Sequence, residues 1–406
     1  MRSSRNVDCS LDAAVILSAL ALRPGGAGVS TYIREMLANL PHYVDATFSA
    51  IVPNDALGEL PPVVRPLPRP NSSGIRRKLQ ALKPVGGASL IHGLDVDLPI
   101  CSGTPMITTV HDLAVFDVPW AFPARRVVGE RLIVARSVAA ADVVIAVSAF
   151  TAERVKAILQ REAVVIPEAP SDSMRIPGCD EIATVRKRYR LPERYVLHVG
   201  TIEPRKNVWI LADACQRAKI PLVIAGNLGW KMSMPRNALI LGFVPQRDLP
   251  ALYGAATIAA YVSVYEGFGL PPLEAMACGC PVLSTRVPSV ELVEGGVFIV
   301  DSPTIDSITH GLSELTSDSA LRSEIAQTGI SLVQRLTWSL AAQATASVYQ
   351  QLGIPVKRTW SSSTSAMPDT HVQATSGEPS GENGRPLLLR KAHLWNMKPL
   401  VEKPGD

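Results

Sequence analysis

The chain has 406 residues, of which 47% are hydrophobic, so it can bury more than one core. This length excludes a small single-domain protein and predicts about two to three domains. A formal net charge of +4, spread along the chain, does not indicate a nucleic-acid-binding protein. The six cysteines, at positions 9, 101, 179, 215, 278 and 280, form no CxxC pair, which fits a reducing compartment and predicts a cytoplasmic protein.

The first apolar run, residues 13–22, follows Arg2 and Arg5 and has two interpretations. It resembles either the apolar region of a secretory signal or a buried strand. The acidic Asp8 and Asp12 precede it, and the RPGGAGVS that follows is typical of a strand-to-helix phosphate loop, so the strand is favoured. No other apolar run approaches the ~18 to 20 residues of a membrane-spanning helix, so we expect a soluble protein or one peripheral on the inner face of a membrane.

Apolar runs of strand length alternate with helix-like stretches, as in a parallel sheet with crossover helices. The first series of predicted strands covers residues 14–20, 47–52, 105–110, 143–147 and 164–166, and the second covers 195–199, 222–225, 239–241, 258–262, 281–284 and 297–300. This α/β pattern predicts two Rossmann-like sheets in series. Their ligand is expected in the cleft between the two domains.

Three glycines, Gly25, Gly26 and Gly28, lie between the first predicted strand and a helix expected to begin near Ser30. Backbone N–H groups in such a loop can bind a diphosphate, and a plain tight turn is the alternative. The loop lacks the GxGxxG spacing of a dinucleotide site, which disfavours an NAD enzyme.

The segment TTVHDLAVF places His111 and Asp112 at the carboxyl end of a predicted strand, where open α/β sheets bind their ligands. His111 could hydrogen-bond a hydroxyl of the ligand or stabilise charge as a bond in the ligand breaks, and Asp112 could orient neighbouring groups or a second substrate. His92 is interpreted as a packing or cleft-edge residue. Two acidic residues nearby, Asp95 and Asp97, form a DxD sequence that we do not interpret as a metal site.

In HVGTIEPRKN, residues 198–207, Arg205 and Lys206 lie at a turn between a predicted strand and a helix expected to begin near Asn207. Two cations at a strand end can neutralise a diphosphate whose negative charge grows as it leaves. Two solvated surface charges are the alternative.

In EGFGLPPLE, Glu266 and Glu274 flank a glycine-containing loop and the start of a helix predicted near Leu270. Gly267 and Gly269 allow tight turns and close approach of a ligand to the backbone, and the helix start can bind an anion. Carboxylates repel phosphate but accept hydrogen bonds from hydroxyls, so a nucleotide-sugar fits between them. Solvated acids at a helix start are the alternative.

The segment SVYEGFGLPPLEAMACGCPVLST, residues 263–285, resembles the nucleotide-binding signature of the retaining GT-B glycosyltransferases of the GT4 family. The resemblance implies that Glu266 contacts the donor sugar and that Glu274 contacts the ribose. It also implies a catalytic set and a donor-binding set. The catalytic set is His111, Glu266, Lys206 and Arg205, and the donor-binding set is Gly26, Gly28, Phe243, Val244, Gly267, Phe268, Gly269, Leu270 and Glu274. Phe243 and Val244 belong to LGFVPQRDLPALYGAA, which is similar to the segment that lines the nucleotide base.

The GT-B resemblance also implies the domain organisation. We expect an N-terminal acceptor domain over 1–170, a linker over 171–190, a C-terminal donor domain over 191–337, a helix over 338–352 that crosses back to the first domain, and a tail over 353–406. The tail is rich in Ser, Thr, Pro, Gly and charge, which predicts disorder, although its apolar and basic end could form a weak amphipathic segment.

The EPRKN form of the turn at residues 203–207 is most similar to mannosyl- or rhamnosyltransferases of surface polysaccharide assembly. The implied activity is transfer of a hexose, with mannose favoured, from a nucleotide-diphosphate sugar to a hydroxyl of a glycan or lipid-linked glycan in cell-surface polysaccharide synthesis. The anomeric configuration would be retained, and neither a metal nor another cofactor is expected. Two alternatives are a GT-B nucleotide-sugar epimerase and a non-catalytic nucleotide-sugar-binding protein. The donor base stays open, because its recognition would use backbone and apolar contacts.

Overall fold

The structure is a computed structural model that describes residues 13–26, 28–72, 74–100, 103–230 and 233–357. Seven parallel strands form the first sheet in the order β3-β2-β1-β4-β5-β6-β7. Their bounds are β1 Ala14–Ser18, β2 Thr47–Pro53, β3 Val64–Arg69, β4 Leu90–Gly93, β5 Met106–Val110, β6 Val143–Ala146 and β7 Val164–Val165. The favoured interpretation of the first apolar run is therefore confirmed, because β1 is an interior strand that pairs with β2 and β4.

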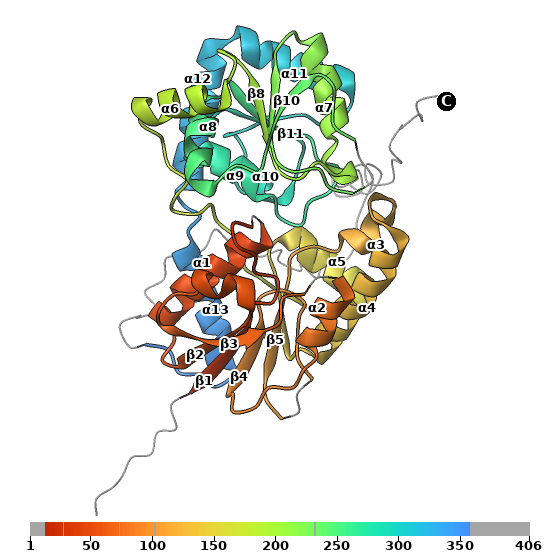
Figure 1. Cartoon of the computed structure of the whole chain (residues 1–406), viewed down its shortest axis with the longest axis vertical. Coiled ribbons are helices and arrows are strands. Elements are labelled where there is room, and N and C mark those ends of the chain that lie inside the picture. Colours follow the sequence, from red (N-terminus) through yellow and green to blue (C-terminus); the bar gives the residue numbers. More distant parts are fainter. Residues whose placement is uncertain (1–12, 27, 73, 101–102, 231–232, 358–406) are drawn as a thin grey trace, which may run out of the picture. The chain divides into compact units, whose positions relative to one another are not determined.

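Helices cover both faces of the first sheet (Figure 1). They are α1 Val29–Tyr43, α2 Gly74–Ala81, α3 Ala114–Asp117, α4 Ala124–Ala140 and α5 Ala149–Leu159, with short 3-10 turns η1 Asn54–Glu59 and η2 Pro119–Ala121. Successive residues of a strand point to opposite faces, so Leu17 belongs to the same buried cluster as Met36 of α1, whereas Ile16 belongs to that of Val138 of α4. Burial on both faces explains why these strands read as continuous apolar runs.

Two strands of this sheet, β3 and β4, are absent from the sequence-based prediction. β3 is the edge strand and contains Pro66 and Pro68, which interrupt the strand pattern but are tolerated where one side of the strand has no partner. β4 has only four residues, and the polar His92 lies among them. The prediction failed here because neither strand presents a long apolar run.

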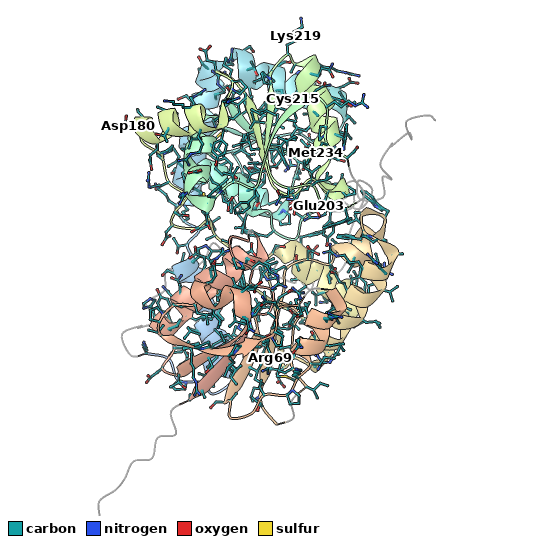
Figure 2. All side chains as sticks on the ribbon, viewed as in Figure 1. Arg69, Asp180, Glu203, Cys215, Lys219 and Met234 are labelled. Carbon is teal, nitrogen blue, oxygen red and sulfur yellow. The ribbon has the colours of Figure 1, made fainter. Side chains whose placement is uncertain are left out.

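Six parallel strands form the second sheet in the order β10-β9-β8-β11-β12-β13. Their bounds are β8 Val196–Val199, β9 Leu222–Ala225, β10 Ala238–Gly242, β11 Ile258–Tyr261, β12 Val282–Ser284 and β13 Phe298–Ile299. The surrounding helices are α6 Cys179–Tyr189, α7 Val208–Arg217, α8 Leu249–Ala255, α9 Leu270–Ala277, α10 Pro288–Glu291, α11 Ile305–Ser317 and α12 Ser319–Val333, with 3-10 turns η3 Pro204–Lys206 and η4 Gln246–Asp248. Figure 2 labels Glu203 and Lys219 at opposite ends of this sheet, and Glu203 marks the end that carries the carboxyl termini of the strands.

The segment 171–190, predicted as a linker, is only partly a connector. It holds α6, which packs against α8 of the second sheet. Val185 of α6 is 3% exposed, and its burial in the core explains why the segment folds into a helix.

The predicted crossover helix corresponds to α13, Trp338–Gln351, which packs against α1 of the first sheet (Figure 1). Tyr349 of α13 forms a buried hydrogen bond of 2.7 Å between its hydroxyl and Nδ1 of His92. This contact gives His92 the packing role expected from the sequence.

The first residues of the predicted disordered tail are ordered, which corrects its boundary. Ile354 is 3% exposed, and Val356 forms an antiparallel bridge with Val44. The backbone N–H of Lys357 donates to the Tyr43 carbonyl at 2.9 Å. These apolar and backbone contacts hold residues 353–357, while residues 358–406, with the predicted amphipathic end, lie outside the described part of the chain.

Candidate functional site

A cavity of about 560 Å³ lies where the carboxyl ends of both sheets meet. Its walls come from the β1–α1 loop, the end of β5, the β8–α7 turn, the end of β10 and the loop before α9. All thirteen sequence-predicted site residues line it: Gly26, Gly28, His111, Arg205, Lys206, Phe243, Val244, Glu266, Gly267, Phe268, Gly269, Leu270 and Glu274. The structure therefore brings together residues that lie up to 248 positions apart in the chain, from Gly26 to Glu274.

A cluster of opposite charges occupies the β8–α7 turn. Arg205 forms ion pairs with Glu266 and, at 2.6 Å, with Glu203. Lys206 Nζ lies 3.7 Å from Glu266 Oε1 and is 13% exposed. Burial alone would raise the pKa of Glu266, but the charges of Arg205 and Lys206 outweigh it and lower this pKa to about 2. Glu266 is therefore an ionised carboxylate that holds both cations at the cavity.

The turn has a local structural cause. Asn207 adopts a left-handed conformation, with φ of 52°, and its side-chain amide donates to the Val262 carbonyl at 3.2 Å. This contact ends η3 and starts α7, so that the two cations project into the cavity. A side chain at Gly200 would lie 2.8 Å from Lys206 Nζ, so the glycine at the strand end leaves room for the lysine.

Glu274 lies in α9 and is 9% exposed. The Tyr253 hydroxyl donates to Glu274 Oε2 at 3.2 Å, and the Tyr261 hydroxyl donates in turn to Tyr253. Burial raises the pKa of Glu274 to about 7 against the opposing effects of Tyr253 and Lys206. The two glutamates of the motif thus have opposite pKa shifts, because Glu266 contacts cations and Glu274 does not.

The glycine loop before α9 docks against the first sheet. A Cβ at Gly267 would overlap the carbonyl oxygen of His111, and the hydroxyls of Ser148 and Thr151 donate to the Gly267 carbonyl. Gly269 has φ of 99°, which glycine adopts without strain. The sequence-based interpretation attributed Gly267 to ligand approach, but the space beside its Cα is filled by the end of β5.

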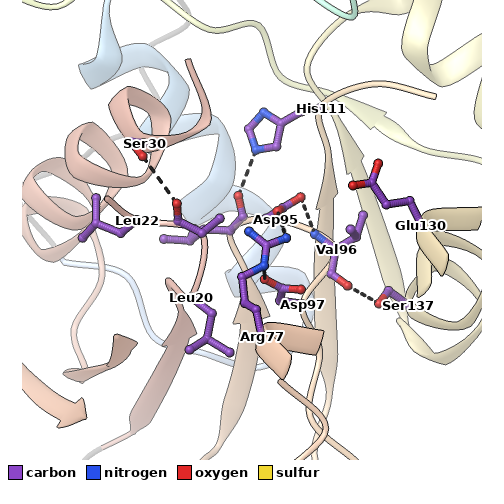
Figure 3. Close-up of polar contacts among 12 residues, drawn as sticks. Leu20, Leu22, Ser30, Arg77, Asp95, Val96, Asp97, His111, Glu130 and Ser137 are labelled. Atoms are coloured by element: carbon purple, nitrogen blue, oxygen red, sulfur yellow. Dashed lines mark hydrogen bonds and ion pairs between the residues drawn. The ribbon is translucent and has the colours of Figure 1, made fainter. Parts of the chain in front are cut away.

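His111 has both ring nitrogens engaged. Nδ1 lies 3.0 Å from Glu168 Oε1, and Nε2 lies 2.9 Å from the carbonyl oxygen of Leu94. Figure 3 shows the His111 ring with a dashed line to a carbonyl oxygen. Burial alone would lower the pKa of His111, but the hydrogen bond and charge of Glu168 outweigh it and raise this pKa to about 9. Because each ring nitrogen faces an oxygen that can only accept, both nitrogens carry a proton and His111 is an imidazolium. Of the two predicted roles, this geometry therefore favours stabilisation of charge over a hydrogen bond to a sugar hydroxyl.

The coupling of His111 to Glu168 predicts a pH-dependent stability. Because the pKa is about 9 in the folded protein and about 6.5 in the unfolded chain, the pair contributes most below pH 6.5, and its contribution is lost as the pH rises through 9. We expect Glu168→Gln to lower the free energy of unfolding by up to about 3 kcal/mol at pH 6 and by much less at pH 9.5. Urea unfolding at both pH values measures this, and an equal loss at both would contradict the assignment.

The β1–α1 loop contributes Gly26 and Gly28, although Ala27 between them lies outside the described residues. Arg34 holds the loop by donating to the Gly26 carbonyl at 2.6 Å. Across the cavity, Phe243 is 57% exposed, and its ring would lie 3.1 Å from a Cβ at Gly25. Phe243 therefore presents a free aromatic face to a ligand, whereas Val244, 7% exposed, is largely packed in the core.

Sequence reasoning missed two carboxylates of this site. Glu203 lies two positions before Arg205 and is 3% exposed, and Glu168 lies at the start of the segment that joins the two sheets and is 5% exposed. Glu203 could have been found from the sequence, because it precedes Arg205 and Lys206 in EPRKN. An acidic residue so close to two cations indicates an ion pair with one of them. No local pattern identifies Glu168, because only the fold brings it to His111.

Asp95 and Asp97, the DxD residues, contact Arg77 at 3.6 and 3.5 Å. Among the described residues, no cluster of three or more His, Cys, Asp or Glu side chains has the geometry to hold a metal ion. Within the same part of the chain, no helix is both long enough and apolar enough to span a bilayer.

The two parallel-sheet domains and the cavity at their carboxyl ends are those of a GT-B protein, and comparisons with known proteins agree. Residues 182–331 match the family model described as glycosyl transferases group 1. The O-antigen chain mannosyltransferase B of Escherichia coli is 32% identical over 267 residues, which cover 61% of this chain and 70% of that protein. The serotype-specific mannosyltransferase WbdA of Escherichia coli is 28% identical over 184 residues, 41% of this chain but only 23% of WbdA. The chain belongs to the group 1 glycosyl transferases.

Solved structures show the same fold. Sucrose-phosphate synthase from Thermosynechococcus elongatus aligns with a TM-score of 0.67 at 20% identity, covering 84% of this chain and 99% of that one. HepE from Anabaena, solved in complex with UDP-glucose, aligns with a TM-score of 0.65 at 17% identity, covering 83% and 99%. The predicted GT-B fold and the family resemblance are confirmed, and the chain is a glycosyltransferase.

Proposed function

We propose that the protein is a retaining hexosyltransferase that moves a mannose-like sugar from a nucleotide-diphosphate donor to a hydroxyl of a glycan or lipid-linked glycan. The observation that carries this proposal is the cavity at the sheet ends, where Arg205, Lys206, Glu266 and Glu274 lie together. The two cations suit a leaving diphosphate, and the two carboxylates suit sugar and ribose hydroxyls.

In the proposed reaction, the bond between the donor anomeric carbon and the diphosphate oxygen breaks, and its electron pair stays on that oxygen. The acceptor oxygen forms the new bond to the same face of the anomeric carbon, and the acceptor proton passes to the departing oxygen. Lys206 and the His111 imidazolium stabilise the developing charge. Arg205 is held by Glu203 and Glu266, so it acts chiefly by fixing Glu266 against the sugar.

Mannose is favoured because two relatives are named mannosyltransferases, at 32% and 28% identity. The base of the donor is a separate question, since HepE is solved with UDP-glucose. A thermal-shift screen of the full chain with UDP, GDP, TDP and ADP sugars tests donor binding, because a bound donor raises the melting temperature. NMR of the product with the preferred donor then tests retention, and an inverted anomeric centre would contradict the mechanism.

Two alternatives use the same fold. An epimerase would convert the donor without an acceptor, and a non-catalytic protein would bind it without any turnover. Glu266 is paired with two cations, so it is poorly suited to the proton transfers that an epimerase needs. Transfer of sugar to an added acceptor separates the proposed activity from both.

A surface on the first domain supports peripheral membrane association. On α4, Val128 and Leu132 are 62% and 68% exposed, and Leu79 of the neighbouring α2 is 59% exposed. Arg125 and Arg76 are exposed on the same two helices. Apolar and basic side chains together fit an anionic lipid surface, where a lipid-linked acceptor would lie.

For this surface, Arg125→Ala is expected to weaken binding to vesicles that contain phosphatidylglycerol by about fivefold, since one basic residue contributes about 1 kcal/mol there. Co-sedimentation measures the binding, with the exposed Lys187→Ala on α6 as a control. Equal binding to vesicles of neutral phosphatidylcholine would contradict the membrane assignment.

A further inference from the structure

A second cavity, of about 330 Å³, lies beside the donor cavity and is not accounted for by donor binding. The two cavities share the lining residues Val29, His111, Asp112, Glu203 and Arg205, so they adjoin at the proposed reaction centre. A pocket of this size is adequate for a small ligand. A molecule bound in it would lie directly next to the donor sugar.

Arg77 of α2 lines the second cavity. Its guanidinium lies between Asp95 and Asp97, as Figure 3 shows. Asp97 is 1% exposed, and neither of its carboxylate oxygens has a hydrogen bond within the described chain. The two carboxylates therefore neutralise the charge of Arg77. The arginine lines the second cavity, but it is not available to bind an anion.

Phe122 and Arg126 of the first half and Trp230 of the second half also line this cavity. Trp230 follows the donor-cavity residue Asn227, and its indole Nε1 donates to the Ala121 carbonyl at 2.6 Å. The Trp230 ring stacks on Phe122 with 5.5 Å between ring centroids, and Arg126 lies 4.3 Å from the Trp230 centroid. Because Trp230 belongs to the second half, the cavity is complete only when the two halves are together.

The charges that line the second cavity are nearly all compensated. Arg77 pairs with Asp95, Arg126 with Glu130 at 2.8 Å, Arg205 with Glu203, and His111 with Glu168. Among the described lining residues, Lys78 and Asp112 are the charged groups without an ion pair, and they contribute one charge of each sign. An anionic ligand would find little net attraction here. A ring with several hydroxyls would find donors and acceptors of both kinds.

We propose, resting on the function proposed above, that this second cavity binds the acceptor as a neutral, polyhydroxylated sugar ring. Lys78 and Glu130 are its specificity-determining residues. Lys78 donates to a ring hydroxyl, and Glu130 accepts from another while it neutralises Arg126. Trp230 closes the wall, so the acceptor is enclosed when the halves meet. The hydroxyl that reacts points to His111 and Asp112, where the two cavities adjoin.

The test uses the full chain, the donor selected by thermal shift, and two probes that differ in charge: methyl α-D-mannopyranoside and mannose 6-phosphate. Release of nucleoside diphosphate is measured with and without each probe. The wild type is expected to accept the neutral probe with a KM at least about tenfold below that of the phosphorylated probe. Lys78→Ala should raise the KM for the neutral probe about tenfold, whereas the exposed Lys83→Ala should not.

A second variant tests charge compensation directly. Glu130→Gln removes the carboxylate that pairs with Arg126, so it should reverse the preference toward mannose 6-phosphate. A wild type that prefers the phosphorylated probe or responds to neither, or variants with unaltered KM values, would overturn the inference while donor cleavage persists. A wild type that neither binds nor cleaves any nucleotide-sugar would overturn the proposed function instead.

Discussion

Lys206→Ala is expected to lower kcat by about 10² to 10³-fold, the loss typical for removal of one preorganised group that stabilises a developing oxyanion. Lys206 Nζ lies 3.7 Å from Glu266 Oε1 in the donor cavity and is 13% exposed, so water cannot easily replace its charge. Glu266 keeps its stronger partner Arg205 in the variant, and the fold should therefore persist. Initial rates at saturating donor and acceptor measure kcat.

The exposed Lys187→Ala on α6 is the matched control for the Lys206 variant, since it removes a lysine of equal charge that does not line the cavity. It should keep near-normal turnover. Circular dichroism and melting temperature show whether Lys206→Ala is folded. If a folded Lys206→Ala protein transfers sugar at a normal rate, Lys206 does not stabilise the leaving diphosphate.

Glu274→Gln is expected to weaken donor binding by about 10 to 100-fold at pH 8, because a hydrogen bond to a charged acceptor contributes about 1.5 to 3 kcal/mol. The pKa of Glu274 is about 7, so the wild type should bind donor more tightly as the pH rises from 6 to 8. The variant should lack this dependence. Calorimetric titration with the nucleotide-sugar at both pH values measures it.

Glu274→Gln should also raise the free energy of unfolding, although it weakens donor binding. The pKa of Glu274 is about 7 in the folded protein, whereas a solvated glutamate in the unfolded chain has its ordinary pKa of 4.5. Between these two values the native state holds a proton that the unfolded chain has lost, so the free energy of unfolding of the wild type falls as the pH rises through this window. Glu274→Gln should be up to about 3 kcal/mol more stable than the wild type at pH 8 and equal to it near pH 4.

The exposed Glu193→Gln is the control for Glu274, since it removes a carboxylate that water already solvates. It should match the wild type in both donor affinity and pH dependence. A Glu274→Gln protein that binds donor as tightly as the wild type at pH 8 would contradict the ribose assignment. Lower stability at pH 8 would contradict the burial effect on its pKa.

The pattern of apolar runs in the sequence predicted most strands of the two sheets, because parallel strands buried on both faces are continuously apolar. It failed for β3, which carries two prolines at an edge, and for β4, which is short and contains His92. It also treated 171–190 as a connector, where the buried Val185 anchors α6. In each case the missing information was which side of the segment has a neighbour, and a single sequence does not record it.

In the candidate site, too, some residues could be predicted from the sequence and others could not. The segments around Arg205 and Lys206, and around Glu266 and Glu274, could be selected from the sequence because glycine, proline and charge recur at fixed offsets within a few residues. Glu168 could not, because it meets His111 across 57 residues. The second cavity could not either, since its walls join α2, α4 and Trp230.

The sequence alone therefore indicated the family, through the resemblance carried by residues 263–285. It also indicated the α/β architecture and the residues of the candidate site, because these depend on short-range periodicity and spacing. Only the tertiary structure decided the state of those groups. Glu266 is strongly acidic because two cations lie beside it, whereas Glu274 is weakly acidic because it is buried without one. A pKa depends on the charge and solvent within a few ångströms, and that surrounding is set by packing.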